Sequence, residues 1–169
     1  MPDQRRVAVA NTSPLQYLHQ CDLIDLLPKL YPEVLVPPAV VQELANGRAL
    51  GFDLPDPTTY RWARVVRPAS MAILPAVSDL GAGEREALAL AAETPETVLI
   101  IDDGLARRHA EILRVRFTGT AGLLVKAKEA GLIPTVAPIL DRLAALRFRL
   151  TPETRAAILR LVGETEARA

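Results

Sequence analysis

The run Thr-Val-Leu-Ile-Ile at residues 97–101, followed directly by Asp-Asp-Gly at 102–104, constrains the fold of this chain more than any other feature. A short, continuous run of β-branched and aliphatic residues is typical of a strand that is buried on both faces of a parallel sheet. The two aspartates and the glycine then end the strand, and a helix is expected to follow. The segment therefore predicts a buried strand whose carboxyl end is polar.

Strand-like and helix-like segments alternate along the rest of the chain. Further strands are expected at residues 7–10, 34–36 and 115–117, with a small edge strand at 65–66. Helices are expected at 14–20, 22–31, 38–46, 58–64, 84–93, 105–113, 120–131, 135–146 and 152–162. This alternation predicts an α/β fold with a parallel sheet and helices on both of its faces. We expect one domain over residues 1–163 and a frayed tail over 164–169.

Composition and charge limit the function classes. The chain has 169 residues, half of them hydrophobic, which suits one domain with one core. Its 20 basic and 20 acidic side chains give a net charge of zero, whereas a non-specific nucleic-acid binder usually carries a clear basic excess. Any contact with nucleic acid must therefore come from a local patch.

Cysteine usage and hydropathy indicate the compartment. The single cysteine, Cys21, excludes an intrachain disulfide framework and a Cys-rich zinc site, and we expect it in the core. No apolar run approaches the roughly 20 residues of a transmembrane helix. The polar residues 1–6 lead directly into a strand and do not resemble a signal peptide. We therefore expect a soluble cytoplasmic protein without a membrane partner.

Oxygen-bearing side chains stand at several strand ends and helix starts. In open α/β sheets, sites form outside the carboxyl ends of the strands. The candidates are Asn11, Glu43, Glu84, Asp102 and Asp103. Hard cations such as Mg²⁺ and Mn²⁺ prefer oxygen ligands, and clustered carboxylates repel one another unless a cation or a proton compensates. The sequence therefore predicts a divalent-metal site if these side chains converge.

Each candidate also has an ordinary structural explanation. Asp102 and Asp103 are favoured caps for the following helix, and Glu84 complements a helix dipole. Glu43 suits the solvated face of an amphipathic helix, and Glu86 is expected in solvent or in an ion pair. Ser13 is expected to cap the first helix, with proline next to it. Under this alternative, the chain is an unrelated α/β domain with scattered caps.

Four motifs resemble those of the PIN-domain superfamily, in the same order. They are Val-Ala-Asn-Thr-Ser-Pro-Leu at 9–15, Val-Pro-Pro-Ala-Val-Val-Gln-Glu-Leu at 36–44, Gly-Glu-Arg-Glu-Ala-Leu-Ala-Leu-Ala at 83–91 and Ile-Ile-Asp-Asp-Gly-Leu-Ala-Arg at 100–107. Phe-Thr-Gly-Thr-Ala-Gly-Leu-Leu at 117–124, followed by Ala-Lys at 127–128, resembles a bacterial and archaeal branch of VapC-like PIN proteins. The resemblance spans residues 7–150.

The resemblance implies a three-layer α/β/α sandwich that binds Mg²⁺ or Mn²⁺ and cleaves RNA phosphodiesters. Many such proteins are toxins that a cognate antitoxin restrains, and they often form homodimers. Asn11 stands where most catalytic PIN domains have Asp, and it keeps a carbonyl oxygen but loses the charge. The alternative function is therefore a catalytically weakened PIN-fold binding or regulatory protein.

The motif positions also imply residue roles. Glu43, Glu84 and Asp103 are expected to be catalytic, and the expected metal ligands are these three with Asn11 and Asp102. Ser13, Arg107 and Arg108 are expected to bind RNA or to support the site. The alternative for the two arginines is an ion-pair brace inside the fold.

Overall fold

A computed structural model describes residues 6–74 and 79–166 of the chain. The strands within these residues are β1 (Val7–Ala10), β2 (Val34–Val36), β3 (Ala63–Val65), β4 (Thr97–Ile100) and β5 (Phe117–Thr118). The helices are α1 (Thr12–Gln20), α2 (Leu26–Leu30), α3 (Pro38–Ala49), the 3-10 helix η1 (Pro57–Thr59), α4 (Ala82–Glu93), α5 (Gly104–Ile112), α6 (Thr120–Glu129), α7 (Ala137–Ala145) and α8 (Pro152–Leu161).

All five strands are parallel and lie in the order β3-β2-β1-β4-β5. In register, Ala10 of β1 lies beside Ile100 of β4, and the next backbone N–H, that of Asn11, donates to the Ile100 carbonyl at 3.1 Å. The chain winds outward from β1 through β2 and β3, then returns to start β4 on the other side. The carboxyl ends of β1 and β4 therefore form the switch point of the sheet, where open α/β folds place their sites.

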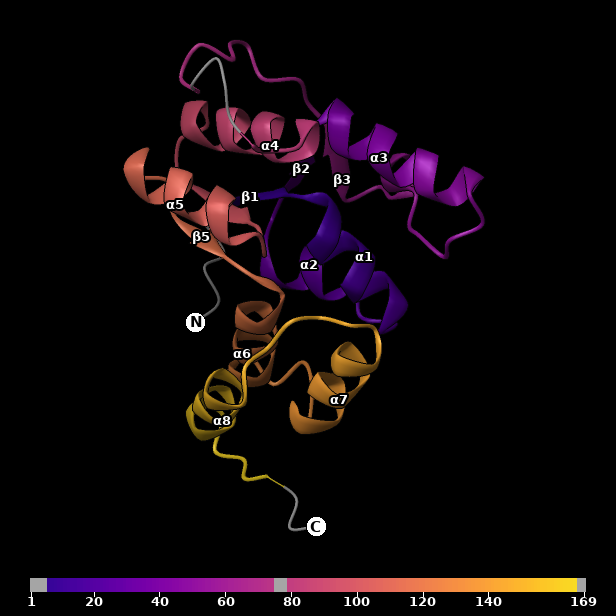
Figure 1. Ribbon diagram of the computed structural model, residues 1–169, viewed down its shortest axis with the longest axis vertical. Helices are drawn as coiled ribbons and strands as arrows, with labels where there is room; N and C mark the ends of the chain where they lie inside the picture. The colour runs from indigo at the N-terminus through magenta and orange to yellow at the C-terminus, as the bar shows by residue number, and fades with distance from the viewer. Residues whose placement is uncertain (1–5, 75–78, 167–169) are drawn as a thin grey trace.

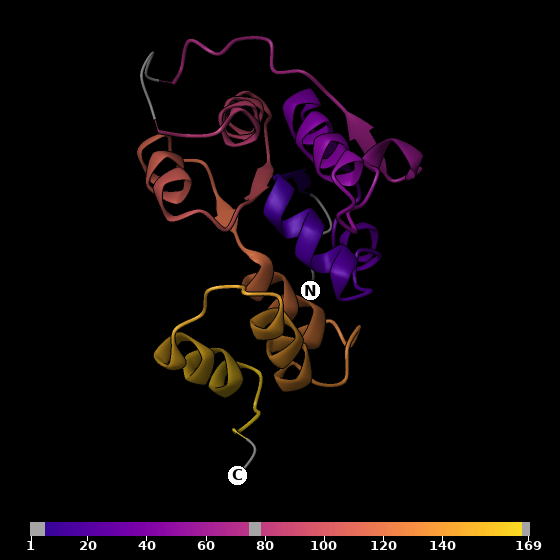
Figure 2. The ribbon, with the colours of Figure 1, turned by 45° about the vertical axis from the view of Figure 1, so that its right-hand side comes forward.

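The strand side chains alternate between two cores. One face of the sheet packs with α1, α2 and α6 and contributes Ala8, Ala10, Val34, Val36, Val98 and Ile100. The opposite face packs with α4 and α5 and contributes Val9, Leu35, Leu99 and Ile101. This period of two is what a sheet covered on both faces requires, and it confirms the predicted three-layer α/β/α sandwich. Figures 1 and 2 show α6, α7 and α8 gathered at one end of the molecule, beside the C-terminus.

Helices α3 and α4 pack against each other and are joined at their starts. Pro37 is the N-cap of α3 and Pro38 its first residue, as the fixed φ of proline favours. The backbone N–H of Ala39 donates to Oε2 of Glu86 at 2.8 Å, and Arg67 lies 3.9 Å from the same carboxylate. Glu86, expected in solvent or in an ion pair, thus also caps a neighbouring helix.

Three local predictions were wrong. The helix expected at 22–31 is reduced to α2, because Asp22 adopts a left-handed φ of 58° and residues 21–25 form turns instead of a helix. The helix expected at 58–64 is replaced by η1 and β3, because β3 pairs with the open edge of β2. The expected cap Ser13 lies inside α1, which begins at Thr12 as soon as β1 ends.

The cysteine, the hydropathy of the helices and the C-terminal tail were also the subject of predictions. Cys21 is free and buried in the core, as predicted. Among the described residues, no helix is long and apolar enough to span a membrane. The frayed tail stays a prediction: residues 167–169 lie outside the described residues, and Glu164 accepts hydrogen bonds from the backbone N–H groups of Val136 and Ala137 at 2.8 and 2.9 Å.

Candidate functional site

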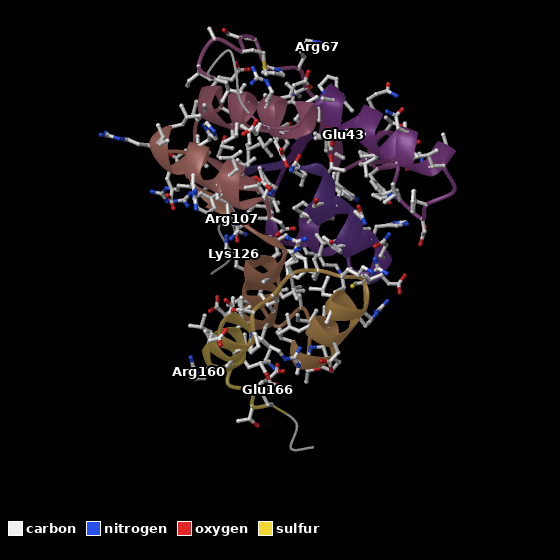
Figure 3. All side chains as sticks on the ribbon, in the orientation of Figure 1. Glu43, Arg67, Arg107, Lys126, Arg160 and Glu166 are labelled. Atoms are coloured by element: carbon white, nitrogen blue, oxygen red, sulfur yellow. The ribbon has the colours of Figure 1, made fainter. Side chains whose placement is uncertain are left out.

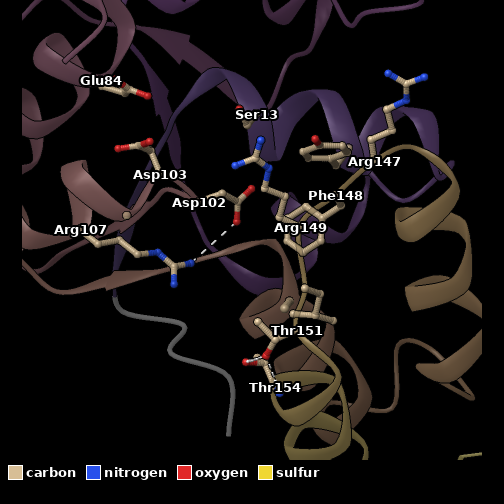
Figure 4. Close-up of a pocket in the computed structure, with 14 residues that line it drawn as sticks. Ser13, Glu84, Asp102, Asp103, Arg107, Arg147, Phe148, Arg149, Thr151 and Thr154 are labelled. Carbon is tan, nitrogen blue, oxygen red and sulfur yellow. Dashed lines mark hydrogen bonds and ion pairs between the residues drawn. The ribbon is translucent and has the colours of Figure 1, made fainter. Parts of the chain in front are cut away.

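A cleft of about 620 Å³ opens at the switch point of the sheet. One wall carries Ser13, Glu84, Asp102, Asp103 and Arg107. The opposite wall is formed by residues 147–151 of the α7–α8 connection and by Thr154. Figure 4 shows the Glu84 and Asp103 carboxylates directed into the same part of this cleft. The tertiary structure therefore brings together acidic side chains from α4 and from the end of β4, which are separated in sequence.

Asn11 lies at the carboxyl end of β1 and is 3% exposed. Its Oδ1 is the one buried side-chain polar atom in the described part of the chain that has no hydrogen-bond partner. An unsatisfied buried acceptor costs about 1–3 kcal/mol, so nearly all such atoms have a donor or a cation beside them. This oxygen is therefore suited to bind a cation or a donor that comes from outside the chain.

Glu43 joins three helices rather than facing solvent. Its Oε1 accepts the backbone N–H of Gly83 at 2.8 Å, and its Oε2 accepts a short hydrogen bond from the Thr12 hydroxyl. Figure 3 places Glu43 on α3 beside α4 and α1. Within the described chain, Glu43 and Asn11 do not line the cleft. The expectation of a merely solvated Glu43 is wrong, and both of its oxygens already have donors.

Glu84 combines a local cap with an unfavourable charge environment. Its Oε2 accepts the Gly81 N–H at 2.8 Å, which completes the first turn of α4. Burial raises the pKa of this carboxyl above its ordinary value, and the charges of Asp103 and Glu43 raise it further. The Glu84 carboxylate is thus close enough to those of Asp103 and Glu43 to be repelled by both. A cation would relieve that repulsion.

The two adjacent aspartates have different roles. Asp103 is the N-cap of α5, and its Oδ1 accepts the Ala106 N–H at 2.8 Å. The capping alternative is thus confirmed for Asp103, and its second oxygen has no described donor. Asp102 accepts the Thr120 N–H at 2.8 Å and the Thr120 hydroxyl at 2.7 Å, and burial raises its pKa. Asp102 therefore ties the end of β4 to the start of α6.

Arg107 braces the same junction. Its Nε donates to the Ile101 carbonyl at 3.0 Å, and its Nη2 lies 3.8 Å from Asp102 Oδ1. A Cβ on Gly119 would overlap this guanidinium and would come to 2.7 Å from Asp102 Oδ1. The brace alternative is therefore what the structure shows for Arg107. Arg108 is exposed on α5 and, among the described residues, is not part of the cleft lining.

The donor set suits an open cation site. Within residues 6–74 and 79–166, no group of three or more His, Cys, Asp or Glu side chains is arranged so that it could hold a metal ion. Three oxygens at this edge of the sheet have no described donor: Oδ1 of Asn11, Oε1 of Glu84 and Oδ2 of Asp103. Mg²⁺ is usually held by one or two carboxylates, with water and substrate phosphates completing its shell. The residues present fit that kind of site.

Several residues that form the site were missed in the sequence. Thr12 and Gly83 hold Glu43, Thr120 holds Asp102, and Arg149 lines the far wall of the cleft. Thr12 and Gly83 lie inside the first and third PIN-like motifs, and that position could have indicated that they belong to the site. The Arg-Phe-Arg run at 147–149 combines basic and aromatic side chains, a pattern that could have indicated a nucleic-acid contact.

A parallel sheet with an oxygen-rich cleft at its switch point defines a class of α/β proteins that bind small or phosphorylated ligands there. A family model described as a PIN domain (DUF3368) matches residues 7–164. The chain belongs to this PIN-domain family, and PIN domains are in general divalent-metal-dependent nucleases. No curated protein and no solved structure gave a significant match to the chain.

Proposed function

We propose that the protein is a divalent-metal-dependent endoribonuclease of the VapC type. The observation that carries this proposal is the buried, unpaired Oδ1 of Asn11, at the sheet edge where Glu43 and Asp103 both repel the Glu84 carboxylate. An unsatisfied acceptor and mutually repelling carboxylates both favour the same kind of occupant, a hard cation. RNA is the substrate class that membership in the family supports best.

Each site residue has a role in this proposal. Asp103, Glu84 and Asn11 would hold Mg²⁺ or Mn²⁺ through their three free oxygens. Glu43 and Asp102, which were also predicted as ligands, would add negative charge near the cation. When bound, the cation polarises the phosphate and lowers the pKa of attacking water. Asp103 and Glu84 are the principal ligands in this proposal, and Glu43 is a further ligand or orients the attacking water. Ser13 lies in the cleft lining, where its hydroxyl can contact a phosphate.

A second candidate function is an RNA-binding or regulatory PIN domain with weakened catalysis. The observation that favours it is the neutral Asn11, together with the engagement of both oxygens of Glu43 and of Asp102. A site with fewer free charges binds a divalent cation more weakly. Under this alternative, RNA occupies the cleft but is not cleaved.

Incubation of a labelled single-stranded RNA with purified protein separates the two candidates. We expect cleavage in Mn²⁺ or Mg²⁺, none in EDTA, and a large loss in Asp103→Asn, which keeps the helix cap. Glu111→Gln is the matched control, because Glu111 is exposed on the same helix, α5, outside the cleft. RNA that binds but stays intact in every divalent cation would favour the second candidate. An Asp103→Asn variant that cleaves as fast as the wild type would contradict the nuclease proposal.

The proposal includes partners and assembly. A self-toxic nuclease in the cytoplasm must be restrained, so we expect an antitoxin that covers the acidic cleft and inserts a basic side chain among the carboxylates. We also expect a homodimer through apolar side chains of the C-terminal helices at 139–146 and 158–162, where Leu161 is 71% exposed. Harmless expression without a neighbouring protein would contradict the first expectation. A monomeric mass at micromolar concentration would contradict the second.

A further inference from the structure

The α7–α8 connection supplies the second wall of the cleft, and this wall is basic. We propose that Arg149 and Arg147 bind phosphates of a single-stranded RNA that crosses the cleft, with Arg149 nearest to the carboxylates. This inference rests on the proposed nuclease function and specifies how the substrate is positioned. It makes the two arginines positioning residues.

Phe148 fixes the backbone between the two arginines. Its ring packs edge-on against Tyr17 of α1, with centroids 5.1 Å apart and an interplanar angle of 83°. Its backbone N–H donates to the Leu143 carbonyl at 2.9 Å, at the end of α7. Phe148 is half-buried, whereas Arg147 and Arg149 on either side of it are exposed. The aromatic anchor therefore holds two cations at the rim of the cleft.

Within the described part of the chain, neither arginine braces the fold through its side chain. Among the described residues, Arg147 and Arg149 form no ion pair and no side-chain hydrogen bond. By contrast, Arg142 lies 3.0 Å from Asp22 and Arg155 lies 2.8 Å from Asp141. These two arginines thus have a carboxylate partner, whereas Arg147 and Arg149 have none among the described residues. Their guanidinium groups are available to a ligand.

The two walls complement a phosphodiester. Figure 4 shows the Arg149 guanidinium extending toward Asp102 and Ser13, whereas Arg147 points away from the carboxylates. A guanidinium binds phosphate with two parallel hydrogen bonds, and a cation held by the opposite carboxylates would bind the same anion. A volume of about 620 Å³ lies within the usual range for ligand sites. Arg147 thus lies farther from the carboxylates than Arg149 does. An RNA strand that continues past the cleaved bond would pass Arg149 first and Arg147 next.

The carboxylates also argue against an acidic protein segment as the occupant. Its carboxylates would pair with the arginines but would be repelled by Glu84 and Asp103 on the opposite wall. A phosphodiester brings its charge together with divalent counterions, which those carboxylates bind. The cleft therefore favours nucleic acid over an acidic peptide.

Binding of a fluorescent single-stranded RNA, measured by anisotropy with Ca²⁺ as the cation, tests the proposal. The variants are Arg149→Ala, Arg147→Ala and Arg149→Lys. Arg160→Ala is the control, because Arg160 is exposed on α8 outside the cleft lining (Figure 3). The loss of one phosphate contact should lower the slope of log affinity against log salt by about 0.7, with affinity falling roughly tenfold. Arg149→Lys should keep the slope and lose part of the affinity, because lysine retains the charge but not the planar fork.

Different results refute different claims. If the wild type binds RNA and both alanine variants match Arg160→Ala in affinity and salt slope, the inference is overturned and the nuclease proposal is untouched. If the alanine variants bind weakly but the wild type cleaves nothing in any divalent cation, the inference holds and the nuclease proposal fails. A wild type that binds an acidic peptide and no RNA overturns both. Melting temperatures identify a variant that is misfolded. If an alanine variant is misfolded, the affinity and salt slope of Arg149→Lys test the inference instead.

Discussion

The backbone N–H of Gly83 donates a 2.8 Å hydrogen bond to Oε1 of Glu43, across 40 residues of sequence. The start of α4 thereby holds a carboxylate of α3 in place, and the Thr12 hydroxyl holds its other oxygen. A Cβ on residue 83 would come to 2.6 Å from Glu43 Oε2. A side chain at this position would therefore fit only if the Glu43 carboxylate moved.

Gly83→Ala should destabilise the protein by about 1–2 kcal/mol, because the methyl group displaces the Glu43 carboxylate from its donors. Chemical denaturation measures this loss. Gly104→Ala is the control, because a Cβ there meets no atom within 4 Å and the residue opens helix α5. Equal stabilities of the two variants would show that Glu43 moves aside without cost.

Asn11→Asp should raise the affinity for Mn²⁺ roughly tenfold, or about 1–2 kcal/mol, because it restores a negative charge at the site. The same change should lower the stability of the metal-free protein, since it adds a buried charge near other carboxylates. Thermal melts with and without Mn²⁺ measure both effects. Asn46→Asp, on the exposed face of α3, should show neither. An unchanged melt in both conditions would place Asn11 outside the site.

Glu84→Gln should stabilise the metal-free protein at pH 7. Burial and the neighbouring carboxylates raise the native pKa of Glu84 above its ordinary value of 4.5. The native state then holds this proton more tightly than the unfolded state, so the contribution of Glu84 to stability is fully present below pH 4.5 and is lost as the pH rises through the native pKa. The variant should lose this part of the pH dependence and should gain less stability from Mn²⁺.

Stability curves from pH 3.5 to pH 8 would measure this difference. Glu111→Gln, on the exposed face of α5, controls for the loss of one negative charge. If Glu84→Gln and the wild type had parallel curves, the carboxylates of Glu43, Glu84 and Asp103 would not interact as described.

Arg147→Gly should increase stability by about 0.5–1 kcal/mol, because Arg147 adopts a left-handed φ of 64° that glycine accommodates without strain. Arg114→Gly should give a similar gain, since Arg114 follows α5 with a φ of 56°. Only the first change should weaken RNA binding, because Arg114 lies outside the cleft. A loss of affinity in both variants would indicate a general charge effect.

Local patterns in the sequence were sufficient to predict most of the sheet. The strands at 7–10 and 34–36 have the predicted bounds, and the strand expected at 97–101 ends one residue earlier. The two errors at 22–31 and 58–64 arose where a long-range partner or a left-handed residue overrode helical periodicity. Residues at the carboxyl ends of β1 and β4 were identified for the same local reason, because parallel strands deliver their ends to one edge of the sheet.

The sequence by itself determined where strands end in oxygen-bearing residues, because burial periodicity and turn residues are local properties of a chain. Only the tertiary structure decided that Asp102 braces Thr120 while Asp103 keeps a free oxygen, although the two are adjacent and chemically identical. It also decided that Arg149 lies across one cleft from Asp102 and Asp103, which are nearly 50 positions earlier in the sequence. These relationships depend on how distant segments pack against the sheet, and that packing follows from the free energy of the whole chain rather than from any one segment.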